Sequence, residues 1–236
     1  MESQTPVLKA GHHWKEADRV ADYVSQEDRD AAEMAKVFRI MTDMLPFEPD
    51  APLRVLDVGS GHGVVAAAVL DAFPNATAVG LDVSEAMMEV GRPRMARFGD
   101  RFRYHPGDFS DGTLPAELVG PFDVVVSARA IHHLVSENKQ RLYADIRGHL
   151  ADDGCFVNID NMRAKDDFFR PLYRRGPAAV RPAPRPAADP SQPRSPGSGE
   201  HPDPMEDQLG WFREAGYSHV DCFWKQLGRS MIVGFK

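Results

Sequence analysis

Short aliphatic runs alternate with longer amphipathic stretches along most of this chain of 236 residues. From Ser25 onward, apolar residues at positions 34, 37, 38, 41, 44 and 45 recur at offsets of three and four, which predicts a helix that ends before Pro46. Further on, strands are predicted at 54–58, 77–81, 101–105, 122–127 and 155–160, with helices at 64–73, after Ser84 and from about Glu137. Regular alternation of strand and helix predicts an α/β fold with a largely parallel sheet.

The end of the chain breaks this alternation. Residues 211–216 form a helical stretch closed by Gly216, and residues 220–225 and 229–235 form two strand-like runs. Only three residues, 226–228, separate the two runs, so they are predicted to form an antiparallel hairpin at the edge of the sheet.

Composition narrows the function classes. The chain is 42% hydrophobic, enough to bury a core, and its net charge of −7 lacks the basic excess that most nucleic-acid-binding proteins carry. It holds two cysteines and shows neither a basic-then-apolar leader nor a long apolar run. We therefore expect a cytoplasmic protein with reduced thiols and no membrane span.

One segment does not fit the α/β pattern. Residues 177–204 contain nine prolines and a single large aliphatic side chain, Val180, so they cannot build a core. We expect a mobile loop at about 176–204. Because residues 163–194 carry eight basic and three acidic side chains, a cationic lid over the active site is the alternative.

The most informative string is the glycine-rich run from Val55 to Gly63 (VLDVGSGHG). It fails the dinucleotide fingerprint G-x-G-x-x-G, because Val64 stands where the third glycine belongs. Asp57 precedes the turn and Asp82 ends the second predicted strand, 25 residues later. A nucleoside with an amino-acid tail fits these positions better than a dinucleotide, with Asp57 and the turn near its ammonium group and Asp82 on its ribose diol.

Taken together, four strings resemble the class I S-adenosylmethionine-dependent methyltransferases in order and spacing: 55–63, 79–84, 106–109 with 121–125, and 131–134 leading to 150–154. The resemblance implies a Rossmann-like, doubly wound sheet of seven strands in the order 3-2-1-4-5-7-6, mostly parallel with an antiparallel C-terminal hairpin. It also implies that residues 1–50 form an N-terminal helical cap and that residues 51–236 form the domain that binds S-adenosylmethionine.

The same resemblance assigns cofactor contacts position by position. The glycine-turn residues would contact the methionine part of the cofactor. One aspartate would contact its ammonium group and another its ribose, and the remaining residues would contact the adenine or the sulfonium. The acids have a second interpretation as caps or turn residues, and the two cap aromatics as simple helix packing. In that order the positions are Gly59, Ser60 and Gly61; Asp57; Asp82; Asp108 and Phe109; Val83 and Met87 on either side of the adenine; Ser127 and Ala128 near the sulfonium; Trp14 and Tyr23 in the cap.

Candidate catalytic residues are His132 and His133, after the fourth predicted strand, and Asp160, at the end of the fifth. Some small-molecule O-methyltransferases of similar pattern use such a histidine and aspartate as general base and partner; His132 is slightly favoured here. Either histidine could instead only shape the pocket. Asp160-Asn161 resembles the metal-binding pair of catechol-type enzymes, but Ser127 stands where those need a carboxylate, so we expect no metal.

The leading hypothesis is therefore an enzyme that moves a methyl group from S-adenosylmethionine to an O, N or C nucleophile of a small molecule by in-line displacement, with S-adenosylhomocysteine as product. A tRNA-modifying methyltransferase is one alternative, and a non-catalytic S-adenosylmethionine-binding partner protein is the other. The oligomeric state is open, with a homodimer among the possibilities.

Overall fold

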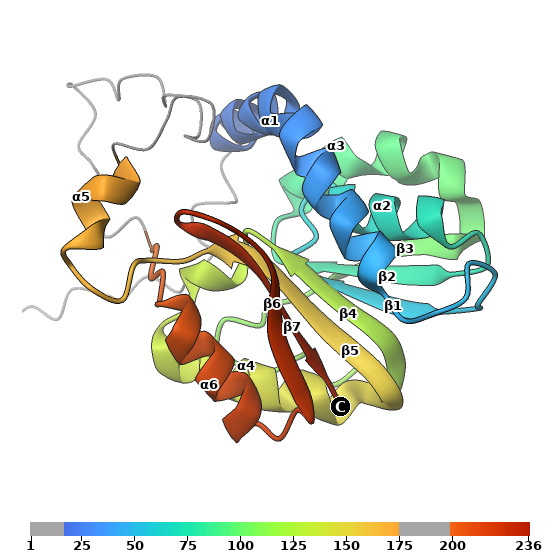
Figure 1. Cartoon of the computed structure of the whole chain (residues 1–236). Coiled ribbons are helices and arrows are strands. Elements are labelled where there is room, and N and C mark those ends of the chain that lie inside the picture. The colour runs from blue at the N-terminus through green and yellow to red at the C-terminus, as the bar shows by residue number, and fades with distance from the viewer. Residues whose placement is uncertain (1–16, 175–198) are drawn as a thin grey trace, which may run out of the picture.

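A single seven-stranded sheet organises the protein, as a computed structural model shows for residues 17–174 and 199–236 (Figure 1). The strand order is β3-β2-β1-β4-β5-β7-β6, which confirms the predicted topology. Strands β3, β2, β1, β4 and β5 pair in parallel, and β7 pairs antiparallel with both β5 and β6. The strands are β1 (Arg54–Val58), β2 (Thr77–Asp82), β3 (Phe102–Pro106), β4 (Phe122–Ala128), β5 (Leu150–Asn161), β6 (His219–Gln226) and β7 (Arg229–Phe235).

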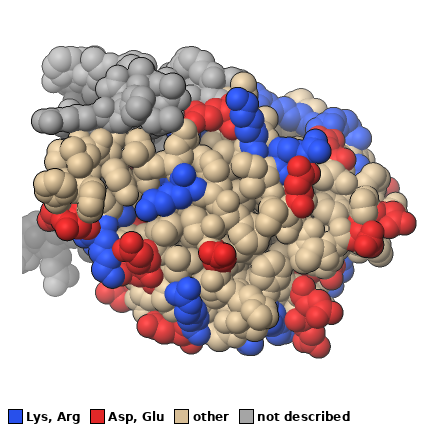
Figure 2. All heavy atoms as spheres, viewed as in Figure 1, with Lys and Arg blue, Asp and Glu red and all other residues tan. Residues whose placement is uncertain are grey.

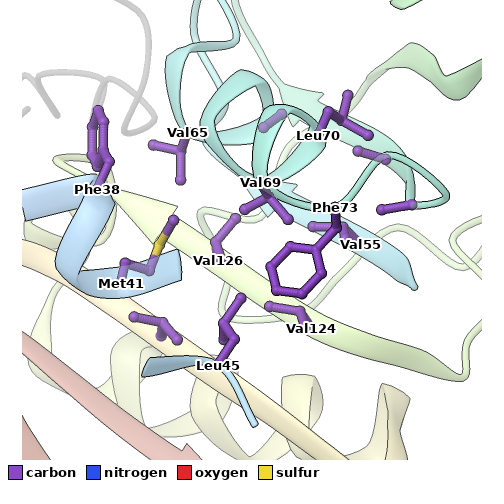
Figure 3. Close-up of a cluster of buried hydrophobic side chains, with 14 of the residues drawn as sticks. Phe38, Met41, Leu45, Val55, Val65, Val69, Leu70, Phe73, Val124 and Val126 are labelled. Carbon is purple, nitrogen blue, oxygen red and sulfur yellow. The ribbon is translucent and has the colours of Figure 1, made fainter. Parts of the chain in front are cut away.

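Helices cover both faces of this sheet. They are α1 (Ala17–Met44), α2 (Val64–Ala72), α3 (Glu85–Met95), α4 (Ser136–His149), α5 (Phe169–Arg174) and α6 (Met205–Glu214), with short 3-10 segments η2 (Ala96–Arg101) and η3 (Ile131–His133). Side chains of α1 and α2 meet Val55, Val124 and Val126 of the central strands in one buried cluster (Figure 3). On the opposite face, α4 and α6 pack through Tyr143 and Phe212 against Phe156 of β5.

Helix α1 begins at Ala17, eight residues before the predicted start. The predicted apolar stripe is buried at Met34, Val37, Phe38 and Met41, whereas Met44 is 49% exposed and the prediction was wrong for that residue. The stripe docks α1 on α2, so the helix continues toward the chain terminus beyond the residues whose burial made it recognisable.

Strand β5 also extends beyond its prediction, because the expected turn at residues 152–154 lies inside it. Phe122 of β4 pairs with Leu150, but Val124 already pairs with Cys155, so residues 151–154 bulge out of the ladder. The predicted turn is therefore a bulge within the strand, which pairs with β4 on both sides of it. Helix α5 and segment η3 were not predicted, since elements of three to six residues are too short to show a period.

Residues 199–204, the end of the predicted proline-rich loop, lie against η3 and α4. The His201 amide donates to the His132 carbonyl at 2.6 Å, and Arg163 pairs with Pro204 in an isolated bridge. Residues 175–198 of that loop and residues 1–16 of the predicted cap lie outside the described residues. Within the part of the chain that the structure describes, no helix has the length and apolar character needed to cross a membrane.

Candidate active site

A cavity opens at the carboxyl ends of β1, β2 and β4, where the crossovers of a parallel sheet leave room for a ligand. It contains about 820 Å³ of empty space, including the part open to solvent. The predicted site residues that line it are Gly59, Ser60, Gly61, Asp82, Val83, Met87, Asp108, Phe109, Ala128 and His133.

The glycine turn after β1 forms the floor of this cavity. Gly59 has φ 72° and its amide donates to the Leu81 carbonyl at 2.8 Å, so the turn is tied to β2. A Cβ atom at Gly59 would lie 2.2 Å from the Cβ of Ala130, whereas one at Gly61 would meet only the methyl end of Met87, at 2.9 Å. Gly59 therefore lets the loop after β4 close against the turn, and Gly61 keeps backbone exposed to the cavity.

Asp82 bridges the turn and helix α3. Its carboxylate accepts from the Gly61 amide at 2.7 Å and from the Ser84 amide at 2.8 Å, and the side chain is buried at the cavity wall. Burial raises the pKa of this carboxyl group, an effect that the backbone amides of Ser84, Gly61 and Val83 only partly offset. Each carboxylate oxygen keeps acceptor capacity beyond these amides, so Asp82 can also accept hydrogen bonds from a ligand diol.

Asp57 lies beneath the turn and does not line the cavity. One carboxylate oxygen accepts from the Ala66 amide in the first turn of α2 at 3.0 Å; the other, Oδ1, has no hydrogen-bond partner among the described residues. Complete burial raises the pKa of Asp57 to about 7, and the charge of Asp82 adds to the increase. A cationic ligand group close to the turn would lower the cost of this buried charge.

The part of the cavity around Phe109 is mostly apolar. Phe109 is buried, and its ring edge would be 3.4 Å from a Cβ at Gly59; Val83 and Met87 line the same cavity. Asp108 is exposed and its carboxylate accepts from the Ser110 amide, so it also serves as a turn residue.

One further predicted cofactor residue lies outside the cavity, and the side chains of two others are not described. Ser127 is buried and its hydroxyl donates to the Val58 carbonyl at 2.7 Å, which ties β4 to β1 rather than lining the cavity. Trp14 lies outside the described residues, and of Tyr23 only the helical backbone is described. Its neighbour Val24 is buried against Met87, which brings the N-terminal part of α1 to the cavity wall.

His132 and Asp160 form a buried pair behind the cavity. His132 Nδ1 lies 2.6 Å from Asp160 Oδ1, and the His132 amide donates to Asp160 Oδ2 at 2.8 Å. Burial by itself lowers the pKa of His132, but the charge and hydrogen bond of Asp160 outweigh it and the pKa is raised. Burial likewise opposes ionisation of Asp160, yet His132 and two backbone amides hold the pKa of Asp160 below its usual value.

Of the two candidate catalytic histidines, His133 is the one that lines the cavity. Its ring centroid lies 4.1 Å from that of His132, and its Nδ1 lies 3.2 Å from the Gly199 carbonyl oxygen. Burial, reinforced by the positive charge of His132, lowers the pKa of His133 to about 4. The ring is therefore neutral near pH 7.

Several lining residues were not predicted. They are His62, Val64, Val65, Ser110, Arg129, Ala130 and Leu134. His62 could have been found from its place inside the glycine motif. Nothing in the sequence marks Arg129, whose left-handed backbone (φ 54°) is uncommon outside glycine.

A second cavity, with about 1570 Å³ of empty space, adjoins the first between α1 and α2 and shares His62, Val64 and Arg129 with it. Among the described residues, no group of three or more His, Cys, Asp or Glu side chains is arranged to hold a metal ion.

Part of the chain is similar to known methyltransferases. Residues 56–156 match a family described as "Methyltransferase domain". The chain is 31% identical over 137 residues to malonyl-[acyl-carrier protein] O-methyltransferase of Geobacter sulfurreducens, which covers 58% of this chain and 48% of that protein. It is 32% identical over 150 residues to an uncharacterized methyltransferase of Bacillus pumilus, covering 64% of each.

Among solved structures, an O-methyltransferase family protein from Burkholderia thailandensis has a TM-score of 0.65 at 18% identity, covering 94% of this chain and 63% of that one. At that identity the similarity shows the fold. The aligned region spans less than two thirds of the length of each of these three proteins.

Proposed function

We propose, from the premise that this chain belongs to the class I S-adenosylmethionine-dependent methyltransferase family, that it transfers a methyl group from S-adenosylmethionine to an O, N or C nucleophile of a small molecule. The matches to methyltransferases confirm the family and the enzyme class predicted from the four motifs. The observation that carries the proposal is the cavity at the carboxyl ends of β1, β2 and β4, because it unites the glycine turn, Asp82 and the apolar wall around Phe109.

The residues present fit this cofactor. Asp82 is buried yet faces the cavity and can accept from a ribose diol, and Val83, Met87 and Phe109 offer apolar contacts to a purine ring. Asp57 Oδ1 has no hydrogen-bond partner among the described residues. A cation on the methionine side of the turn would stabilise the buried carboxylate. We propose these residues as the cofactor site.

S-Adenosylmethionine, when bound, supplies an electrophilic methyl group, and the protein's task is to align the nucleophile and to take its proton if it has one. We propose His133 for the proton transfer, because it lines the cavity while His132 is buried against Asp160. With Nδ1 facing the Gly199 carbonyl, which can only accept, Nδ1 carries the ring proton and Nε2 is the atom that takes a proton.

The low pKa of His133, about 4, bears on the acceptor. A weak base assists poorly in deprotonating an aliphatic alcohol but suits a nucleophile whose own proton is acidic. This supports an acidic oxygen nucleophile such as a phenol, in line with the O-methyltransferase named among the relatives.

Calorimetric titration with S-adenosylmethionine and S-adenosylhomocysteine is the first test. We expect micromolar binding of both, followed by formation of S-adenosylhomocysteine when carboxylic acids, phenols and amines are screened as acceptors. Folded protein that binds neither compound would refute the proposal.

The two alternatives are included in the same screen. Binding without turnover of any acceptor would support a non-catalytic cofactor-binding protein. Turnover of bulk tRNA that falls steeply with salt would support the nucleic-acid alternative. The nucleic-acid alternative was suggested by the basic segment 163–194, of which residues 175–194 lie outside the described residues. On the face seen in Figure 2, acidic and basic side chains are interspersed.

A further inference from the structure

A buried ion pair joins helix α4 to the segment that follows the proline-rich stretch. Lys139, in the first turns of α4, is only 1% exposed. Its ammonium group donates to the Asp203 carboxylate at 2.6 Å and to the His201 carbonyl, and the Ser136 hydroxyl donates to the other oxygen of Asp203 at 3.0 Å. The pair therefore fixes residues 201–203 on α4 from two sides.

The same segment contacts both histidines of the site. The His201 amide donates to the His132 carbonyl at 2.6 Å, and the Gly199 carbonyl oxygen lies 3.2 Å from His133 Nδ1. At its far end the Asp203 carbonyl accepts from the Arg163 amide and from the Gln208 side chain, each at 3.2 Å. Residues 199–203 are thus held between α4, α6 and the turn after β4.

We infer that Lys139 and Asp203 are positioning residues that act on His133 through this segment. The inference rests on the proposed function, since it assigns His133 the proton transfer. By holding the Gly199 carbonyl against Nδ1, the pair selects the Nδ1–H tautomer of His133 and leaves Nε2 as the basic nitrogen. Neither residue lines the cofactor cavity, so they act on the reaction only through the histidine.

Energetics favour this interpretation over a purely stabilising role. A buried ion pair adds little net stability over an apolar replacement, because desolvation of both charges offsets their attraction. What it does provide is a single geometry, which apolar side chains would specify less strictly. A second pair on the neighbouring segment, Lys165–Asp207, has a comparable N–O distance of 3.0 Å, but its side chains are 61% and 35% exposed, so it serves as a matched control.

Within residues 17–174 and 199–236, the charged and titratable groups that face the two histidines are Asp160, Glu200, Lys139 and the histidines themselves. Lys139 lowers the pKa of His132 and Glu200 raises it. Removal of the pair therefore changes both the position of the segment and the charge around His132, and the histidine titrations report on both.

The experiment measures tautomer and pKa of His133 by long-range proton–nitrogen NMR on the full chain labelled with ¹⁵N-histidine. Variants are Lys139→Met combined with Asp203→Asn, Asp203→Asn alone, and Lys165→Met as control. In the double variant we expect loss of the pure Nδ1–H tautomer and a further fall in the pKa of His133, because the Gly199 carbonyl accepts from Nδ1 and thereby raises that pKa in the wild type. Asp203→Asn alone keeps an oxygen for Lys139 and is expected to give a smaller change in the same direction.

Binding and turnover complete the test. We expect both variants of the Lys139–Asp203 pair to bind S-adenosylhomocysteine within about twofold of wild type. Turnover is expected to fall by about 10- to 100-fold, because misplacement of a catalytic group lowers the rate rather than the cofactor affinity. An unchanged His133 tautomer and pKa in the folded double variant, or in folded Asp203→Asn if the double variant does not fold, would overturn the inference. The NMR readout needs no methyl transfer, so loss of the proposed function would appear separately as absent cofactor binding by wild type.

Discussion

The two halves of the site lie at the same edge of the sheet but are built differently. In the half that we propose for the cofactor, backbone amides supply the contacts: Gly61 and Ser84 donate to Asp82 across 21 and 2 residues of chain. In the half that we propose for the acceptor, side chains meet across longer separations, with 28 residues between His132 and Asp160 and 64 between Lys139 and Asp203. One half is a property of a short string, and the other exists only once distant segments have packed.

This difference teaches where each half is vulnerable. A backbone-built half tolerates side-chain change but not a change in the conformation of the turn. A half built from buried ionisable pairs depends instead on protonation, because each partner is stable in its charged form only while the other is present. Four changes test this contrast, from the largest expected effect to the smallest.

Gly59→Val should abolish cofactor binding, with the affinity for S-adenosylhomocysteine falling more than about 100-fold. The reason is the collision of a Cβ with Ala130 and the left-handed backbone at φ 72°, not occupation of the ligand's own space. Gly148→Ala is the control: nothing lies within 4 Å of its Cβ and it sits in α4, so binding should not change. Retained binding by Gly59→Val would contradict the turn geometry.

Asp160→Asn should lower the free energy of unfolding by about 3 kcal/mol at pH 7, because it leaves His132 buried without its counter-charge. The lowered pKa of Asp160 means that its contribution is present above the ordinary carboxyl pKa and is lost as pH falls through the folded-state value. Urea denaturation from pH 3 to pH 8 should therefore show wild type and variant converging at the acidic end.

The exposed pair Arg39–Asp43 provides the comparison for that measurement. Both side chains are more than half exposed, so Asp43→Asn should change the free energy of unfolding by less than about 0.5 kcal/mol at any pH. A loss as large as that of Asp160→Asn would mean that burial is not the cause.

Asp82→Asn should weaken S-adenosylhomocysteine binding by about 10- to 100-fold, the equivalent of losing charge-assisted hydrogen bonds to a diol. Asp108→Asn, in an exposed turn that also lines the cavity, should weaken binding by no more than about threefold. Calorimetry on both variants decides the order; the reverse order would move the main polar contact of the cofactor from β2 to the turn after β3.

Asp57→Asn should leave stability unchanged near pH 4 and raise the free energy of unfolding by about 1 kcal/mol at pH 9 in the absence of ligand. The folded-state pKa of about 7 is above the unfolded value, so protonation stabilises the fold at low pH and this contribution is lost as pH rises through 7. A variant less stable than wild type at pH 9 would show that the Asp57 charge is already compensated.

Most of the fold was predictable because it follows from local patterns. The strands β1, β2 and β4 are aliphatic runs bounded by turn residues, and they were located to within one residue. The N-terminal ends of α1 and α6 were predicted too late in the chain; in α6, the first turn carries Glu206 and Asp207, which give no apolar period. The bulge in β5 was predicted as a turn, because only the pairing with β4 shows that the strand already begins at Leu150, before the bulge.

By itself, the sequence determined the parts that need only neighbours: the glycine turn, the acid at the end of β2 and the strand order that the family motifs imply. The tertiary structure alone decided that His133 rather than His132 lines the cavity, that Ser127 ties two strands together, and that residues 199–203 rest on both histidines. The physical reason is that burial and pKa depend on what packs against a side chain, and here the packing partners are far away in the chain. A motif specifies the conformation of its own backbone, while the protonation state of a catalytic group is set by the whole fold.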